Sequence, residues 1–287
     1  MSPRYLRLIA LALVVGVFPI VVRSQRQAAP PATGGDDVVA PGTFSILGFD
    51  PVTQEVGGAV QSCVFSVGNG VLWAEAGVGA VATQAVVDVS YGPKSLELLR
   101  QGMAPKDIIK KVWDDDPDPG YRGQRWPKAG RQFAVMNMKG EMAAFTGPEA
   151  PQESGDAQGK YSTAQGNTLG RPDRKWPPAD GMKPSKVPAA MVGGFENSET
   201  AADGRRNHIS VRLVTALEAG QAAGGDHRCQ QSAALIVVKK GAGVWLNNDV
   251  VLRLQVDDNP QPIAELRRLV EKSPPARQGR GRGGDRP

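Results

Sequence analysis

The sequence predicts an α+β protein built around mainly antiparallel sheets. Strand-like segments follow one another along the chain, joined by short turns, and helix-like segments also occur in succession. A parallel sheet would instead require strands that alternate with helices. With 40% hydrophobic and 22% charged residues, the composition is that of a globular protein, which excludes wholesale disorder.

The first two strands are expected to form a hairpin that begins at Thr43. Residues 43–49 and 55–65 alternate in the manner of strands, and the Asp-Pro-Val-Thr segment at 50–53 is typical of a turn. Residues 77–85 are small or β-branched, so their backbone can lie close to layers on both sides. This run predicts a central, buried strand.

Two short helices follow, and strands and helices then continue to the end of the domain. A Gly-Pro pair at 92–93 opens the first helix, Gly102 ends it, and Pro105 opens the second. The other expected strands are 131–137, 141–146, 160–165, 232–239, 244–246 and 250–256. The other expected helices are a short one near 187–193, one capped by Asn207 that runs through 208–223, and one that starts at Asn259-Pro260.

A short apolar run near the N-terminus predicts a secretory signal peptide over residues 1–24. Arg4 and Arg7 precede fifteen mainly apolar residues at 8–22, and small or polar residues follow. A membrane-spanning helix usually needs about twenty apolar residues, so no membrane span is expected after signal cleavage. The expected location is periplasmic or secreted, and the alternative is an uncleaved N-terminal anchor.

The rest of the chain is expected to comprise a linker, one domain and a tail. Residues 25–42 are rich in Ala, Pro and Gly, a composition typical of a disordered linker or pro-segment. Residues 43–273 are expected to form a single domain, with a Pro- and Gly-rich surface excursion at about 168–206. The Arg- and Gly-rich residues 274–287 predict a disordered tail.

The positive charge is carried by the two ends of the chain. The formal net charge is +5, the first 27 residues carry four arginines and no acid, and the last twelve carry four arginines and one aspartate. Removing both ends leaves about −2 for the body of the chain. No nucleic-acid partner is therefore expected.

Six separated motifs, in order, resemble a bacterial family. The resemblance is to domain-of-unknown-function family 1028, grouped with the N-terminal-nucleophile (Ntn) hydrolases, and it covers most of residues 43 to about 256. It implies a four-layer αββα sandwich of two mainly antiparallel sheets between helical layers, but no substrate. The motifs are TFSILGFDPVTQEVGGAVQS, WAEAGVGAVATQA, SYGP, AAFTG, AQGN and LEAGQAAGGDHRCQQSAAL.

Thr43 is the candidate nucleophile. A threonine hydroxyl is a poor nucleophile, but when threonine is the first residue its own α-amine can accept the hydroxyl proton. With a pKa near 8, about a quarter of such amines are unprotonated at pH 7.5. The bond between Gly42 and Thr43 would have to be cut, by signal peptidase, by another protease, or by attack of the Thr43 hydroxyl on the Gly42 carbonyl. The alternative is a β-branched residue that simply begins a strand.

Four further residues in the motifs could take part in catalysis or orient Thr43. Ser62, on the neighbouring strand, could orient Thr43 or bind substrate, or could be an ordinary strand serine. Gln84 lies among small buried residues, so its amide either donates to an oxyanion or makes a structural hydrogen bond. Asp226 and Arg228 follow a glycine pair and could form a buried pair that holds the site together, or a plain surface turn.

The remaining candidate residues are predicted to contact the substrate. Gln165 and Asn167 flank a permissive glycine at the end of a strand, which suits either substrate contact or a tight turn. Tyr91 could stack on a substrate or pack in the core.

Two cysteines, Cys63 and Cys229, are expected to form one disulfide in an exported protein. A competing interpretation makes Cys63 a nucleophile near His227. The resemblance implies that lysine is common at position 63, where in other Ntn hydrolases a lysine near the nucleophile helps to set its electrostatics. Cysteine at this position is a departure that bears directly on catalysis by Thr43.

No metal centre or cofactor is expected. The chain has two histidines, no histidine pair at ligand spacing and no cysteine cluster. It also lacks a GxxxxGK[ST] loop and a GxGxxG fingerprint between strand and helix.

Together these observations predict an exported Ntn-type hydrolase that cleaves an amide or related acyl bond in a small-molecule or peptide substrate. The alternative is a non-catalytic envelope protein that uses the same fold to bind a small molecule, a peptide or a protein partner. The sequence leaves a homo-oligomer open.

Overall fold

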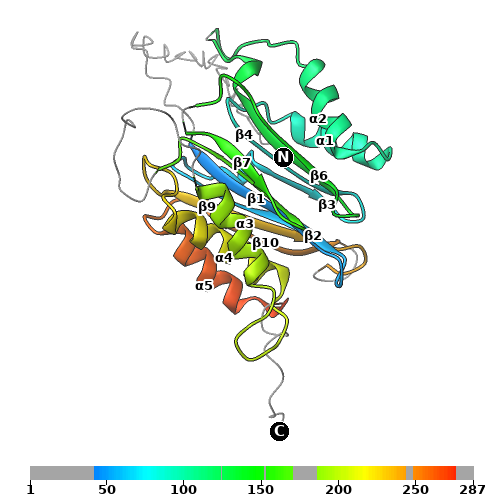
Figure 1. The fold of residues 1–287 in the computed structure, drawn as a ribbon, viewed down its shortest axis with the longest axis vertical. Helices are drawn as coiled ribbons and strands as arrows, with labels where there is room; N and C mark the ends of the chain where they lie inside the picture. Colours follow the sequence, from blue (N-terminus) through cyan, green and yellow to red (C-terminus); the bar gives the residue numbers. More distant parts are fainter. Residues whose placement is uncertain (1–41, 124, 152, 171–185, 244–247, 276–287) are drawn as a thin grey trace, which may run out of the picture. The chain divides into compact units, whose positions relative to one another are not determined.

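Two antiparallel sheets and five helices make up the part of the chain that the computed structural model describes, residues 42–123, 125–151, 153–170, 186–243 and 248–275 (Figure 1). In spatial order, the larger sheet contains β10 (Val250–Val256), β9 (Ser232–Val238), β2 (Glu55–Ser62), β1 (Thr43–Asp50), β8 (Ser162–Asn167) and β7 (Gly155–Gln158). The smaller sheet contains β3 (Leu72–Glu75), β4 (Gly79–Ala85), β5 (Arg131–Asn137) and β6 (Met142–Thr146). The helices are α1 (Tyr91–Arg100), α2 (Pro105–Asp114), α3 (Val187–Asn197), α4 (Ile209–Ala222) and α5 (Pro262–Lys272). The predicted α+β class with antiparallel sheets is confirmed.

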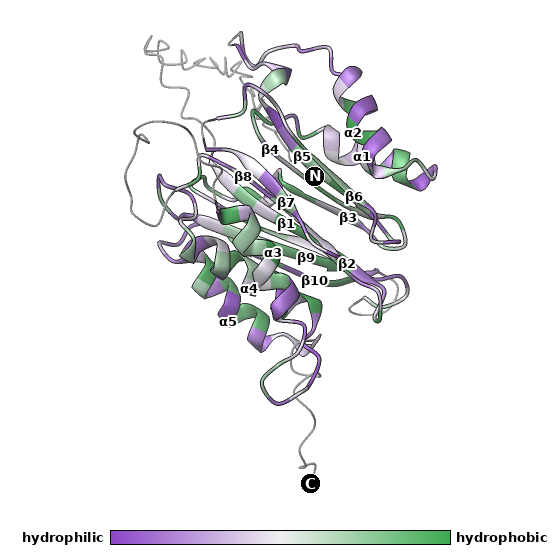
Figure 2. Ribbon diagram, viewed as in Figure 1, coloured by the Kyte–Doolittle hydropathy of each residue, from purple (hydrophilic) through white to green (hydrophobic). Residues whose placement is uncertain are grey.

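Three hydrophobic clusters separate four layers. One cluster lies between the larger sheet and α3, α4 and α5, one between the two sheets, and one between the smaller sheet and α1 and α2. Side chains alternate between the faces of a strand, so in β1 Phe44 and Ile46 pack toward the helices while Leu47 and Phe49 pack toward the smaller sheet. Figure 2 shows hydrophobic strands between the helical layers, whereas α2 and α5 carry both hydrophobic and hydrophilic residues.

The predicted β1–β2 hairpin is present, and its two strands pair along their full length. Thr43 pairs with Ser62 at one end and Asp50 pairs with Glu55 at the other. At the turn, Asp50 Oδ1 accepts hydrogen bonds from the backbone N–H groups of Val52 (2.9 Å) and Thr53 (3.2 Å), as aspartate does in tight turns. The hairpin therefore places Thr43 and Ser62 directly opposite each other.

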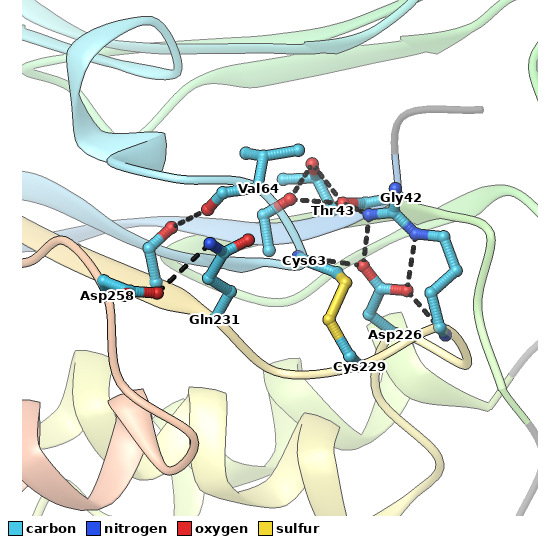
Figure 3. The surroundings of a disulfide bond; sticks show 11 residues. Gly42, Thr43, Cys63, Val64, Asp226, Cys229, Gln231 and Asp258 are labelled. Atoms are coloured by element: carbon cyan, nitrogen blue, oxygen red, sulfur yellow. Dashed lines mark hydrogen bonds and ion pairs between the residues drawn. A yellow bond between two sulfur atoms is a disulfide. The ribbon is translucent and has the colours of Figure 1, made fainter. Parts of the chain in front are cut away.

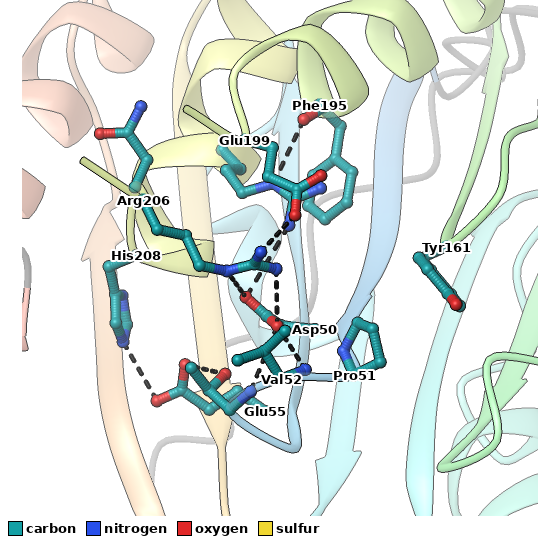
Figure 4. Close-up of polar contacts among 12 residues, drawn as sticks. Asp50, Pro51, Val52, Glu55, Tyr161, Phe195, Glu199, Arg206 and His208 are labelled. Carbon is teal, nitrogen blue, oxygen red and sulfur yellow. Dashed lines mark hydrogen bonds and ion pairs between the residues drawn. The ribbon is translucent and has the colours of Figure 1, made fainter. Parts of the chain in front are cut away.

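Buried ion pairs fix the turn end of this hairpin (Figure 4). The Asp50 carboxylate, 1% exposed, lies 2.9 Å from Arg206 Nη2 and 3.8 Å from Arg212 Nη1. Burial lowers the pKa of Arg212, whose guanidinium stacks 4.0 Å from the centre of the Phe195 ring. Beside them, His208 Nε2 lies 3.1 Å from a Glu55 carboxylate oxygen. The hairpin is thereby joined to α3 and α4.

Several predicted boundaries are wrong. Strand β8 covers Ser162–Asn167 rather than 160–165, and helix α3 continues to Asn197 rather than ending near residue 193. The second strand ends at Ser62 rather than at residue 65, because the chain leaves the sheet there. Helix α4 is capped by His208 rather than Asn207, since His208 Nδ1 accepts a hydrogen bond from Ser210 N–H (3.2 Å). Helix α5 begins at Pro262 rather than at residues 259–260. The pattern also missed β3 and β7, which have four residues each and lie at sheet edges.

Several predictions fall outside the described residues. These are the signal peptide, nearly all of the linker and of the tail, residues 171–185 of the excursion, and the expected strand at 244–246. Within the described ranges, no helix combines the length and apolar character needed to cross a bilayer.

Candidate functional site

Thr43 begins β1 and its side chain faces the space between the two sheets. The residue is 4% exposed, and its Oγ1 lies 2.7 Å from the Gly42 carbonyl oxygen and 3.0 Å from Ser62 Oγ. Ser62 Oγ also contacts the Gly42 carbonyl oxygen. The hydroxyls of Thr43 and Ser62 have one proton each. These two protons serve three close contacts: the two hydroxyls with the Gly42 oxygen, and the hydroxyls with each other. The Thr43 hydroxyl is therefore held beside the carbonyl of the preceding peptide bond.

A buried ion pair supports the same carbonyl (Figure 3). Arg228 Nη2 donates to the Gly42 oxygen (2.6 Å) and to Asp226 Oδ2 (2.7 Å). The Asp226 side chain is fully buried and also accepts a hydrogen bond from Cys63 N–H (3.2 Å). Hydrogen bonds from charged donors are stronger than neutral ones. The Gly42 carbonyl is thus polarised by a guanidinium that is itself held by a carboxylate.

A disulfide fixes the loop that carries this ion pair. Cys63 follows β2 and Cys229 follows Arg228, and the two are joined with their Cα atoms 5.2 Å apart (Figure 3). The predicted pairing is present, and it leaves no free thiol at Cys63 among the described residues. The crosslink connects the end of β2 to the loop between α4 and β9.

A side chain at the residue before Thr43 would disturb this arrangement. A Cβ placed on Gly42 would lie 2.7 Å from Arg228 Nε, Arg228 Nη2 and Asp226 Oδ2. Any side chain would therefore displace the ion pair.

Amide side chains hold the other carbonyl of this segment, that of Thr43 itself. Gln84 Nε2 donates to the Thr43 oxygen (3.2 Å) and to Gln132 Oε1 (2.8 Å), and Gln84 Oε1 accepts from Ser45 Oγ (2.5 Å). Asn167 Nδ2 donates to the same two oxygens, at 3.5 and 3.0 Å. Donation from Gln84 to an oxyanion would require one of these bonds to break. In this structure its amide positions the backbone of Thr43.

Gln165 is connected to Gln84 through the hydroxyl of Ser45. Its Nε2 donates to Ser45 Oγ (2.7 Å), and Ser45 donates to Gln84. Sequence reasoning missed Gln132 and Ser45, although Gln132 carried the signal used for Gln84, a polar amide within an apolar strand. Both residues are buried, at 1% and 0% exposure.

Tyr91 lies away from Thr43, between the smaller sheet and α1. It packs edge-on against Phe133, and its hydroxyl donates to Asp116 Oδ2 (2.7 Å). Burial and the adjacent Asp116 raise the pKa of Tyr91 above its ordinary range. Burial alone would raise the pKa of Asp116, but hydrogen bonds from Tyr91 and from Asp118 N–H, together with the charge of Arg131, lower it. Tyr91 does not line the cavity at Thr43.

A mainly apolar cavity of about 220 Å³ opens at Thr43. Gln84 and Thr43 supply polar groups at its wall, and apolar side chains form most of the rest. The apolar lining residues are Val64, Phe65, Val67, Val71, Ala85, Val87 and Val89. The described residues contain no group of three His, Cys, Asp or Glu side chains that could bind a metal ion.

The fold and the site define an αββα sandwich protein with a buried threonine at the start of a central strand, next to a small apolar cavity. The chain belongs to DUF1028, a family of unknown function whose model matches residues 43–266. It is similar to the crystal structure of protein SPO2555 from Silicibacter pomeroyi, described as a DUF1028 protein, with 29% identity and a TM-score of 0.65 over 83% of this chain and 90% of that one. No curated protein matches the chain.

Proposed function

We propose that the protein is an exported hydrolase of the Ntn type, which cleaves an amide or related acyl bond with Thr43 as its N-terminal nucleophile. The observation that carries the proposal is the arrangement at the Gly42–Thr43 bond. A hydroxyl lies beside the carbonyl of its own preceding peptide, and that carbonyl accepts a hydrogen bond from a guanidinium. The family match, which begins at residue 43, supports the same boundary.

The first step is cleavage of the Gly42–Thr43 bond by the chain itself. Thr43 Oγ1 attacks the Gly42 carbonyl carbon, and Arg228 and Ser62 stabilise the negative charge that develops on the carbonyl oxygen. The carbon–nitrogen bond breaks as the hydroxyl proton passes to the Thr43 nitrogen, which gives an ester. Water then hydrolyses the ester, so that residue 42 leaves as a carboxylate and Thr43 has a free amine.

The second step is hydrolysis of the substrate. The freed amine takes the hydroxyl proton while Oγ1 attacks the substrate carbonyl, and it returns that proton to the leaving amine. Water then releases the acyl group. Arg228 supplies the positive charge that a lysine at position 63 would otherwise bring, because the Cys63–Cys229 disulfide holds the adjacent guanidinium at Gly42.

The disulfide also supports the proposed periplasmic or secreted location. Such bonds persist mainly in oxidising compartments outside the cytoplasm. The signal peptide proposed for residues 1–24 would direct the chain there.

The test is the intact mass and N-terminal sequence of the mature protein, followed by two variants. We expect the wild-type mature chain to start at Thr43. Thr43→Ala should give no chain that starts at residue 43 and should have no amidase activity. Thr43→Ser should partly recover both the cleavage and the activity. Thr53→Ala, in the turn at the far end of the same hairpin, is the matched control: it removes a hydrogen bond to Glu55 (2.9 Å) away from Thr43 and should be processed and active as wild type is. A mature protein that keeps Gly42 attached under all native conditions would refute the mechanism.

The second candidate is a non-catalytic envelope protein that binds a small molecule, a peptide or a protein partner. The well-satisfied Gly42 carbonyl favours it, since the uncut chain already has a complete set of hydrogen bonds at this point. A persistent uncut chain that still binds a ligand in the cavity would support this function.

A further inference from the structure

Two exposed apolar side chains, Phe65 and Val89, line the cavity at Thr43. Within the described part of the chain, the large hydrophobic residues that remain exposed are Val52, Phe65, Val89 and Tyr121. Phe65 (69% exposed) and Val89 (47%) line the Thr43 cavity, while Tyr121 (50%) lines a second cavity. Exposed apolar side chains in the wall of a cavity are typical of a site that binds an apolar ligand.

A second cavity adjoins the first. It has a volume of about 600 Å³, and Val87 and Val89 belong to the walls of both cavities. The cavity at Thr43 alone, about 220 Å³, is smaller than the roughly 300–1,000 Å³ of typical small-molecule sites. A substrate larger than a short acyl group would therefore pass over Val87 and Val89 into the second cavity, where Trp126 and Tyr121 add aromatic walls.

Arg131 places an unused donor in the wall of this second cavity. The residue is 2% exposed, its Nε donates to Asp116 (3.0 Å), and its Nη1 donates to the carbonyls of Val86 (2.8 Å) and Trp126 (3.2 Å). No protein acceptor within the described ranges contacts Nη2. Nη2 keeps some accessible surface, so it can donate a hydrogen bond to an occupant with an acceptor oxygen.

The charges around Arg131 select a neutral acceptor. Asp116 already balances the guanidinium, and Tyr91 and the backbone of Asp118 hold its carboxylate in place. Asp88 adds a second carboxylate to the lining of the same cavity. In the wall of this cavity, Arg131 is already paired with Asp116 and the other charged residue is the acidic Asp88, so a carboxylate on the occupant would meet no unpaired cation there.

We propose that the acyl group of the substrate is an uncharged, mainly apolar chain that fills both cavities and presents a carbonyl oxygen to Arg131. This inference rests on the proposed function, because it takes the cavity at Thr43 as the place of the scissile bond. It adds the class of substrate: an amide of an apolar acyl chain that carries a further carbonyl beyond Val87 and Val89.

Binding can be tested apart from catalysis by titration calorimetry with the full-length Thr43→Ala variant. The probes are N-butyl acetamide, N-butyl octanamide and N-butyl 7-oxooctanamide. We expect octanamide to bind at least about tenfold more tightly than acetamide, because each buried methylene contributes to affinity. The 7-oxo probe should bind more tightly still, and an otherwise matched probe with a terminal carboxylate more weakly.

Variants test whether the octanamide chain contacts Val89, in the wall that the two cavities share. Val89→Asp should remove the advantage of octanamide over acetamide, whereas Val52→Asp, the same change at an exposed valine outside both cavities, should leave it unchanged. Arg131→Lys should remove the advantage of the 7-oxo probe while octanamide still binds. Equal affinity for acetamide and octanamide, or octanamide binding that Val89→Asp does not weaken, would overturn the proposal.

The matching 4-nitroanilides separate this proposal from the proposed function. If the mature wild-type protein cleaves none of them but Thr43→Ala shows the expected binding, the hydrolase proposal fails and the substrate-binding surface stands. If the acetyl and octanoyl compounds are cleaved with equal kcat/KM, the hydrolase proposal stands and the proposed site for a long acyl chain is refuted.

Discussion

Removal of the Cys63–Cys229 disulfide should cost a large part of the stability of the protein. The bond joins residues 166 positions apart, and the loss of loop-closure entropy for a loop of this length corresponds to about 5 kcal/mol at 25 °C. Measured losses for native disulfides are about 2–5 kcal/mol. We therefore expect the double variant Cys63→Ala/Cys229→Ala to unfold with a free energy about 2–5 kcal/mol below that of wild type.

The assay is urea unfolding, followed by circular dichroism, of both proteins with and without reductant. Reductant should lower the stability of wild type to about that of the double variant, and should leave the double variant unchanged. The same variant should also release less chain starting at Thr43, because the loop that carries Arg228 is no longer fixed to β2. A loss below about 1 kcal/mol, or wild type that reductant does not affect, would refute the reasoning.

Three further predictions concern buried groups near the two cavities. Arg228→Met should lower the unfolding free energy by about 3–5 kcal/mol in urea titrations, because it leaves the buried Asp226 carboxylate unpaired, and a change near zero would contradict this. Gly42→Ala should slow the appearance of the mature chain on a mass-spectrometry time course, since its Cβ would displace Arg228, and unchanged kinetics would argue against the role of the ion pair. The lowered pKa of Asp116 means that its contribution to stability is present above the unfolded-state pKa near 4 and is lost as pH falls through the folded value. Asp116→Asn should thus be less stable than wild type at pH 7, and the difference should shrink below about pH 4; a difference independent of pH would refute this.

The sequence predicted the elements in which an extended apolar pattern coincides with clear turns. The β1–β2 hairpin and the buried strand β4 fall in this group, because burial on one or both faces imposes a pattern that can be recognised. Strands β3 and β7 could not be found in the same way, since four residues at a sheet edge are too few to set a period.

The part of the site that depends on strand adjacency was also predicted from the sequence. The hairpin pattern placed Ser62 on the strand beside Thr43, and the disulfide was predicted from the cysteine count in a chain expected to be exported. The contact of Arg228 with the Gly42 carbonyl could not be derived, because it joins segments 186 residues apart through side-chain geometry. The spare nitrogen of Arg131 was hidden for the same reason: a guanidinium has five donors, and only the folded surroundings determine which stay unused.

The hydrogen bonds on the Thr43 carbonyl have a consequence for the state after processing. A new chain terminus produced by cleavage is usually mobile unless other groups hold it in place. Here Gln84 and Asn167 hold an oxygen that lies downstream of the cut and survives it. The fresh end would stay anchored, while departure of residue 42 would leave the Arg228 guanidinium ready to receive the oxygen of an incoming amide. In the proposed mechanism, the Arg228 guanidinium would first stabilise the oxyanion formed at Gly42 during self-cleavage. It would then stabilise the oxyanion of each substrate.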